Sequence, residues 1–225
     1  MSATGSPISQ IPELPDDLSD TILLDGDDVV FDYCPAFGRW LERTHGVAPL
    51  SPRPTSYNME GWLPETHQPR ASQLIAEFNS CPEWFGHLPP TPGSVEFVRL
   101  AKAAGFRLRM LTACSTSASV RSARTENAAR IFGEDAFDEI IFFDLGASKL
   151  HELRKQPRSL WVDDLPKHVR SGYQAGHYGV VVTASHNRSQ RNCREHQDLP
   201  WISSLADLAP ALKARQPSGL SHSLA

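Results

Sequence analysis

Short apolar runs alternate with amphipathic stretches along most of this chain, and this alternation limits its possible folds more than any other feature. Strands separated by helices join as parallel neighbours, with the helices on both faces of the sheet. The runs are nearly continuous in Ile, Leu, Val and Phe, which is typical of strands buried on both faces. We therefore predict an α/β fold with a Rossmann-like, doubly wound parallel sheet. Its strands are expected at residues 21–24, 107–111, 139–143, 159–162 and 179–183.

One long segment, residues 33–88, lacks this alternation. It is rich in proline and aromatic residues and has helical spacing near residues 35–45 and 71–78. Because it falls between the first strand and the next helix, we predict a small, mainly helical cap inserted after the first strand. The α/β core then comprises residues 21–32 and 89–214. Small and polar residues predict a disordered tail at 1–20 and a flexible tail at 215–225.

Composition excludes several classes of function. A net charge of −4 over 225 residues argues against a nucleic-acid partner. The apolar runs are too short to cross a membrane, and the N-terminus lacks the basic start and apolar stretch of a secretory signal. The four cysteines lie far apart, as expected of reduced thiols. We expect a cytoplasmic protein whose oligomeric state is open, a homodimer being one option.

Polar residues follow four of the predicted strands, at the edge where doubly wound sheets bind ligands. Clustered carboxylates repel one another by about 4 kcal/mol for a pair 4 Å apart, and Mg²⁺ removes that penalty. A threonine and a lysine can hold a phosphoryl group, and a carboxylate can attack phosphorus. Taken singly, these residues are also typical of a solvated turn, a helix cap, a strand end and a surface lysine. The polar residues are Asp25, Asp27, Asp28, Thr112, Lys149, Asp163 and Asp164, and Ala113 follows Thr112 at the end of the second strand.

The order of these residues resembles the four motifs of the haloacid dehalogenase-like (HAD) hydrolases. Residues 22–29 (ILLDGDDV) match the first motif, an apolar strand followed by D-x-D-x-[T/V]. Residues 110–112 (MLT) match the second and residues 161–164 (WVDD) the fourth. Lys149 is the best match to the third-motif lysine, with Lys155 as an alternative. The resemblance covers residues 21–214 and implies a HAD-like fold.

The resemblance also implies a role for each residue. Asp25 would be the nucleophile, and Asp27 the general acid and base. Thr112 and Lys149 would hold the transferred phosphoryl group, with Ala113 beside them. Mg²⁺ is the implied cofactor, and its implied ligands are Asp25, Asp27, Asp164 and Asp163, with Asp164 favoured over Asp163 as the direct ligand.

The second acid of the first motif, Asp27, favours a phosphatase, since the dehalogenases of this superfamily need neither that acid nor a metal. The position of the cap and the Asp-Asp ending are similar to the 5′(3′)-deoxyribonucleotidases, and imply a (deoxy)nucleoside monophosphate substrate. One residue departs from that branch: Asp28 stands where glycine is common. Phe31 and Tyr33, next to the first motif, are the candidates for stacking a base, although most cap aromatics are expected to form the cap's own core.

Other chemistries have weaker support. Six residues separate Cys114 from Arg121, one more than the loop of cysteine-based phosphatases allows, and the nine histidines show no zinc-type spacing. The sequence thus predicts a Mg²⁺-dependent phosphomonoester hydrolase that forms an aspartyl-phosphate and acts on a small phosphorylated metabolite. The alternatives are a phosphatase for sugar phosphates or other non-nucleotide substrates, and a binding or regulatory protein that keeps the fold with weak catalysis.

Overall fold

The computed structural model describes residues 13–59, 61–144 and 147–215. Within them, six parallel strands form one sheet in the order β3-β2-β1-β4-β5-β6, which confirms the predicted fold class. A sixth strand is absent from the prediction because two residues are too few to give a pattern. The strands are β1 (Thr21–Asp25), β2 (Arg107–Ala113), β3 (Glu139–Phe143), β4 (Leu160–Asp163), β5 (Tyr178–Val182) and β6 (Trp201–Ile202).

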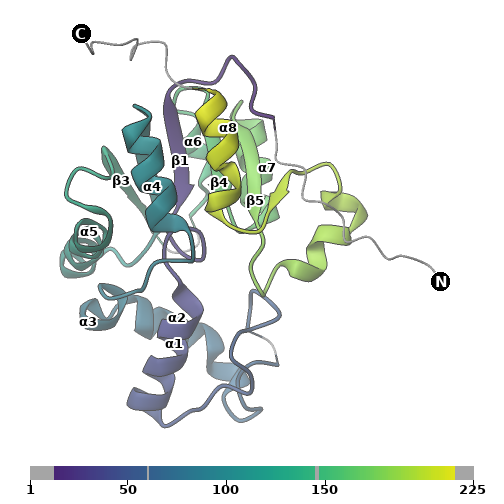
Figure 1. Cartoon of the computed structure of the whole chain (residues 1–225). Helices are drawn as coiled ribbons and strands as arrows, with labels where there is room; N and C mark the ends of the chain where they lie inside the picture. The colour runs from purple at the N-terminus through teal and green to yellow at the C-terminus, as the bar shows by residue number, and fades with distance from the viewer. Residues whose placement is uncertain (1–12, 60, 145–146, 216–225) are drawn as a thin grey trace.

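Helices cover both faces of the sheet. Figure 1 shows α4 and α8 in front of the strands and α6 and α7 behind them. Alternate side chains of β1 lie on opposite faces of the sheet: Ile22 and Leu24 belong to one buried cluster and Leu23 to another. The core helices are α4 (Ser94–Ala103), α5 (Ala118–Phe132), α6 (Leu150–Leu153), α7 (Pro166–Gln174) and α8 (Ala209–Ala214), with 3-10 turns at Arg188–Asn192, Arg194–His196 and Leu205–Leu208.

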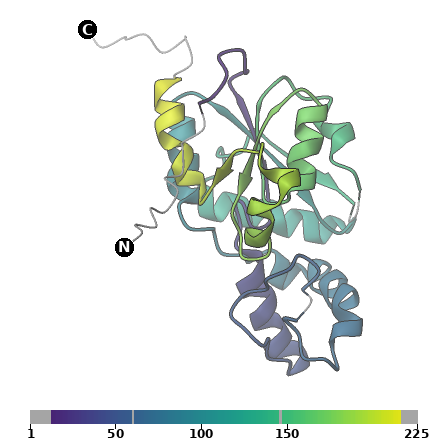
Figure 2. The same cartoon turned by 90° about the vertical axis from the view of Figure 1, so that its right-hand side faces the viewer.

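The insert after β1 is helical and forms a lobe below the sheet (Figure 2). Its aromatic side chains pack on one another: the rings of Phe37 and Phe78 lie 5.2 Å apart, and those of Phe37 and Trp40 5.6 Å. These rings are buried and form the cap's own core. The cap comprises α1 (Tyr33–Trp40) with a π-helical turn at Leu41–His45, a 3-10 turn at Gln68–Arg70, α2 (Ala71–Asn79) and α3 (Pro82–Phe85).

The residues just before β1 pack on the core rather than forming part of a tail. Leu18 is buried, the backbone N–H of Ser19 donates to the Arg158 carbonyl at 2.7 Å, and Asp17 pairs with the Arg158 side chain at 2.9 Å. The remainder of the expected tails, residues 1–12 and 216–225, lies outside the described residues. In the part of the chain that is described, no helix has both the length and the hydropathy to span a bilayer.

Candidate active site

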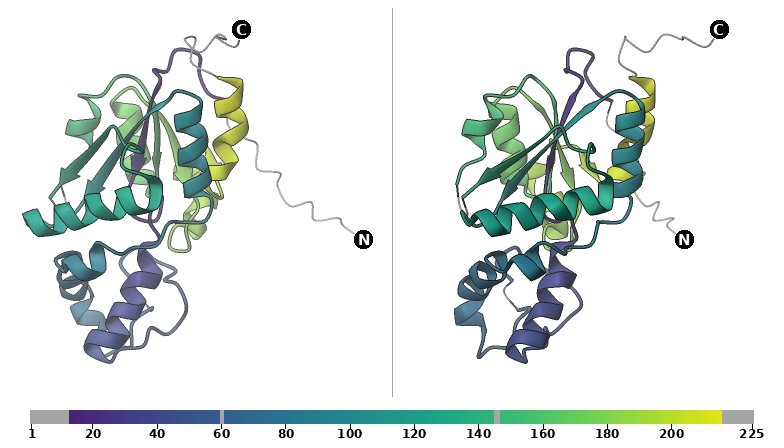
Figure 3. Two further views of the ribbon diagram at one scale, coloured as in Figure 1. Left: turned by 60° about the vertical axis from the view of Figure 1, so that its left-hand side comes forward. Right: turned by 90° about the vertical axis from the view of Figure 1, so that its left-hand side faces the viewer.

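The candidate site lies where β1, β2 and β4 end, at the edge of the sheet that faces the cap (Figure 3). The parallel register places Asp25 beside Leu111 of β2, and Leu24 beside Val162 of β4. The next residues along those neighbouring strands are Thr112 and Asp163, so pairing of the strands alone brings them to the end of β1. The predicted meeting of the first, second and fourth motifs is therefore a consequence of the register.

Lys149 joins two of the carboxylates. Its Nζ lies 2.7 Å from Asp25 Oδ1 and 2.8 Å from Asp163 Oδ2, and its side chain is 4% exposed. Burial lowers the pKa of this ammonium group, but Asp163 and Asp25 outweigh burial and raise the pKa above its ordinary value. Lys155, the alternative third-motif lysine, is exposed and pairs with Glu152. The structure therefore brings Lys149, and not Lys155, to the candidate site.

Asp25, Asp163 and Asp164 form a buried carboxylate cluster with ligand oxygens within 4.8 Å of one another. Burial raises the pKa of Asp25 to about 6 against the opposing effect of Lys149, and burial with the neighbouring Asp163 and Asp25 holds the pKa of Asp164 well above its usual range. One ammonium group thus does not balance three buried carboxylates. An all-oxygen donor set with excess negative charge fits Mg²⁺.

The three carboxylates are not equally free to bind a cation. Asp163 Oδ1 accepts the Leu165 backbone N–H at 2.7 Å and its Oδ2 accepts Lys149, so both oxygens are engaged. Burial raises the pKa of Asp163, but Lys149 outweighs burial and the pKa lies below the ordinary value. The Asp164 side chain pairs with His186 through Oδ2, at 2.6 Å. This arrangement favours Asp25 and Asp164 as metal ligands, with Asp163 holding Lys149.

Asp27 stands apart from this cluster and forms an ion pair with Arg124 of α5. Arg124 is fully buried, and its guanidinium carbon lies 4.4 Å from the centre of the Phe31 ring and 4.3 Å from that of Phe85. Cation–π contact on both faces stabilises a buried guanidinium. Arg124 also lies 3.4 Å from Thr112 Oγ1. The general-acid candidate is thus held at the cavity wall by a residue that the sequence analysis does not include.

Thr112 is completely buried directly under the first-motif loop. A Cβ atom at Gly26 would lie 2.5 Å from Thr112 Oγ1, so the loop can pass over this threonine only with glycine at position 26. Its neighbour Ala113, and not Thr112, lines the cavity. Thr112 therefore packs beneath the loop that follows Asp25, and it is Ala113 that reaches the cavity surface.

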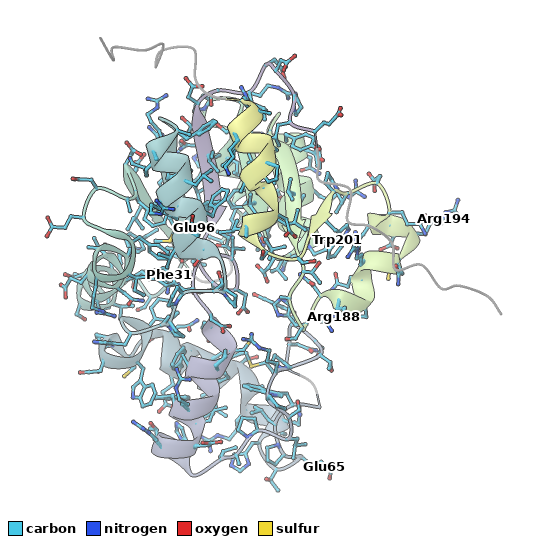
Figure 4. The ribbon with its side chains drawn as sticks, in the orientation of Figure 1. Phe31, Glu65, Glu96, Arg188, Arg194 and Trp201 are labelled. Atoms are coloured by element: carbon cyan, nitrogen blue, oxygen red, sulfur yellow. The ribbon has the colours of Figure 1, made fainter. Side chains whose placement is uncertain are left out.

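A cavity of about 290 Å³ lies between the sheet edge and the cap. Tyr33 lines it and donates from its hydroxyl to Asn79 Oδ1 at 2.8 Å. Phe31 is expected beside the substrate, but it does not line the cavity. Its ring is 0% exposed and packs against Arg124. Figure 4 shows Phe31 in the α/β core and not in the cap. The bridge between Phe31 and Pro90 fixes this position, so the expectation for Phe31 is corrected to a packing role.

Two residues of the site were missed by sequence reasoning, Arg124 and His186. Arg124 lies four residues from buried Val120 and four from buried Ala128, so all three share one face of the helix. An arginine on an otherwise apolar face is the sequence feature that indicates a buried charge with a functional partner. His186 follows β5 and lies 2.6 Å from Asp164. Ligands of doubly wound sheets bind beyond the carboxyl ends of the strands, and His186 lies beyond the end of the fifth strand. The same criterion that selects the residues after the first four strands therefore also selects His186.

No protein-family model and no curated protein matches the sequence. Solved structures are similar in fold. A predicted phosphatase from Clostridium acetobutylicum is 12% identical, with a TM-score of 0.59 over 88% of this chain and 99% of that one. D,D-heptose 1,7-bisphosphate phosphatase from B. bronchiseptica, solved with magnesium and phosphate, is 15% identical, with a TM-score of 0.51 over 86% and 98%.

A putative haloacid dehalogenase-like hydrolase from Bacteroides fragilis is also similar, at 16% identity and a TM-score of 0.53 over 84% of this chain and 99% of that one. Together these likenesses show that the chain has the fold of the HAD-like hydrolases, with a helical insert after β1. These likenesses concern the fold, so substrate choice has to be argued from the cavity.

Proposed function

We propose that this protein is a Mg²⁺-dependent phosphomonoester hydrolase that works through an aspartyl-phosphate on Asp25. The observation that carries the proposal is the pairing of Asp25 with Lys149, beside Asp163 and Asp164, at the floor of the cavity. An ammonium group beside a carboxylate nucleophile neutralises charge where a phosphoryl group would approach. Bound Mg²⁺ would offset the charge of the carboxylates and polarise the phosphoryl group.

The residues divide the reaction into two steps. Asp25 attacks phosphorus, the P–O bond to the leaving group breaks, and Asp27, in its protonated form, gives a proton to the leaving oxygen. Asp27 then takes a proton from water, which attacks phosphorus and frees the Asp25 carboxylate with release of phosphate. Lys149 holds the phosphoryl oxygens, and Arg124 keeps the Asp27 side chain at the cavity wall.

The cavity supports a small substrate with an uncharged leaving group. Of the described residues that line it, Lys149 is the only lysine or arginine, so a second phosphate would meet no fixed cation. The cap side presents apolar Met59 and Ile75 beside Tyr57, whose ring is 57% exposed. A (deoxy)nucleoside monophosphate, its base against Tyr57, is the substrate we favour, and sugar monophosphates are the alternative.

The test is hydrolysis of p-nitrophenyl phosphate by the full chain, with Mg²⁺ and with EDTA. We expect activity only with Mg²⁺ and a loss of at least about 1,000-fold in Asp25→Asn, because the nucleophile is removed. Asp32→Asn is the matched control, since Asp32 pairs with Arg53 outside the cluster. Near-normal activity of Asp25→Asn would overturn the mechanism.

The substrate is tested separately, with a panel of nucleoside and sugar monophosphates. A kcat/KM for the best nucleoside monophosphate at least about tenfold above that for any sugar phosphate would support the nucleotide proposal, and the reverse order would overturn it. Bound Mg²⁺ without turnover of any phosphomonoester would instead favour the binding or regulatory alternative.

A further inference from the structure

A second group of side chains with metal-ligand chemistry lies beside the carboxylate cluster: Asp28, Cys34 and His186. They come from the loop after β1, the first turn of α1 and the loop after β5, and all three line the cavity. One ligand atom from each lies within 4.8 Å of the other two. The phosphatase proposal gives none of them a part in the reaction.

The distances within this group match those around a tetrahedral zinc ion. Cys34 Sγ lies 3.5 Å from Asp28 Oδ2, and His186 Nδ1 lies 3.7 Å from the same oxygen. With Zn–S near 2.3 Å and Zn–N and Zn–O near 2.1 Å, tetrahedral angles place sulfur about 3.6 Å and nitrogen about 3.4 Å from the oxygen. Both distances to Asp28 Oδ2 therefore lie within about 0.3 Å of that geometry, and the ligand atoms of Cys34 and His186 lie within 4.8 Å of each other.

His186 is also held as a metal ligand is held. Its side chain is 3% exposed, and Nε2 lies 2.6 Å from Asp164 Oδ2, a carboxylate outside the group of three. The other ring nitrogen, Nδ1, lies 3.7 Å from Asp28 Oδ2, beyond hydrogen-bond distance. A histidine whose far nitrogen donates to a carboxylate is the usual arrangement around bound zinc.

The ligand types identify the class of ion. A thiol and an imidazole favour zinc-like ions, whereas Mg²⁺ favours oxygen ligands such as the neighbouring cluster offers. His186 lies far along the chain from Asp28 and Cys34, so the histidine spacing in the sequence does not indicate this group.

We propose that Asp28, Cys34 and His186 form a second metal site, of zinc type, whose fourth position opens into the cavity. Three protein ligands with an open position are typical of zinc sites that bind water or a substrate atom. Binding replaces the thiol proton of Cys34, which leaves to solvent, by a sulfur–metal bond. The proposal stands on this geometry and does not depend on phosphatase activity.

Cobalt titration of the full chain tests the proposal, because Co²⁺ bound to a thiolate gives a charge-transfer band in the near ultraviolet and Co²⁺ bound to oxygens does not. Saturating Mg²⁺ throughout keeps the carboxylate cluster from competing. We expect one equivalent of Co²⁺ to produce the band and one equivalent of Zn²⁺ to abolish it. No band in the unmodified chain would overturn the proposal.

Variants identify the ligands. Cys34→Ser is expected to abolish the band, and His186→Asn and Asp28→Asn to weaken Co²⁺ binding at least about 100-fold. Cys81 is a free, half-buried cysteine of the cap. Cys81→Ser is therefore the matched control and is expected to keep the band. Asp25→Asn, which tests the phosphatase proposal, also keeps it. Thermal unfolding confirms that each variant is folded, and a band that persists in folded Cys34→Ser overturns the site.

Discussion

Lys149 is the residue on which the charge balance of the site depends. Its ammonium group lies within 2.8 Å of two carboxylates and is nearly inaccessible to water. Buried carboxylates without a partner are strongly unfavourable, so both Asp25 and Asp163 depend on this one cation when no metal is bound. The sequence leaves open which of Lys149 and Lys155 is the third-motif lysine, because both lie between β3 and β4. Only the path of the chain into α6 places Lys149, and not Lys155, in the candidate site.

Replacing each lysine by methionine separates their roles. Lys149→Met is expected to lower kcat/KM for p-nitrophenyl phosphate by about 100- to 1,000-fold, because a fixed charge that faces the transferring group is lost. Lys155→Met, which removes an exposed ion pair with Glu152, is expected to change kcat/KM less than twofold. Steady-state kinetics with saturating Mg²⁺ is the measurement. Similar losses in the two variants would contradict the assignment.

Arg124 is expected to act through Asp27 alone. Arg124→Met removes the partner of the general-acid candidate, and we expect kcat to fall about 10- to 100-fold while KM changes little. In an Asp27→Asn background the same substitution should have almost no effect on kcat, because the interaction is already absent. A double-mutant cycle of kcat measures this coupling. Additive losses would show that Arg124 acts elsewhere.

At the scale of elements, close packing of α7 on β4 fixes the position of Asp163 and Asp164. A Cβ atom at Gly172 of α7 would lie 2.4 Å from Trp161 Cδ1 on β4, and the Trp161 indole N–H also donates to the His168 carbonyl at 3.1 Å. The helix and the strand therefore approach at a distance that only glycine allows. The fourth motif gains its precise position from this contact.

Gly172→Ala tests this packing. We expect the free energy of unfolding to fall by about 1–3 kcal/mol, because the methyl group forces the Trp161 ring or the helix to move. Gln174→Ala, an exposed site on the same helix, is the control and should change stability by less than about 0.5 kcal/mol. Urea titration followed by circular dichroism is the measurement. Equal stability of the two variants would contradict the packing argument.

The sequence predicts helices and strands well where a residue pattern repeats. It predicts the position of a side chain poorly where a single contact with a distant residue determines that position. The five longer strands and the residues at their ends follow from apolar runs and strand polarity, which are local properties. Phe31 was expected to face the substrate because it is near Asp25 in the chain, yet its bridge to Pro90 turns it into the core. Arg124 and His186 escaped prediction because their partners, Asp27 and Asp164, are distant in the chain.

At the scale of the whole molecule, the buried acids make stability depend on pH in a particular direction. The pKa of Asp25 rises to about 6 and that of Asp28 to about 7, chiefly by burial, and that of Asp164 also rises. The folded state therefore binds more protons than the unfolded state between about pH 4 and pH 7, and stability falls as the pH rises. His186, whose pKa burial lowers, opposes this effect and is outnumbered.

In EDTA, the free energy of unfolding is thus expected to be lower at pH 7 than at pH 5. Mg²⁺ should stabilise the protein more at pH 7, because the carboxylates are then free to bind the ion. Urea titrations at pH 5, 6 and 7, with EDTA or Mg²⁺, provide the measurement, and Asp28→Asn should flatten the slope in EDTA. A rise in stability from pH 5 to pH 7 in EDTA would contradict the assignment of these pKa shifts.

The sheet order places β1 between β2 and β4, although 138 positions separate Asp25 from Asp163. A nascent chain that has emerged only as far as β3 already carries Asp25, Asp27 and Arg124, the ion-pair partner of Asp27, but it lacks Lys149, which pairs with Asp25, and the carboxylates of Asp163 and Asp164. The candidate site is therefore completed only late in synthesis, when β4 and the residues before it have emerged, and a product truncated after β3 would lack the proposed metal site altogether.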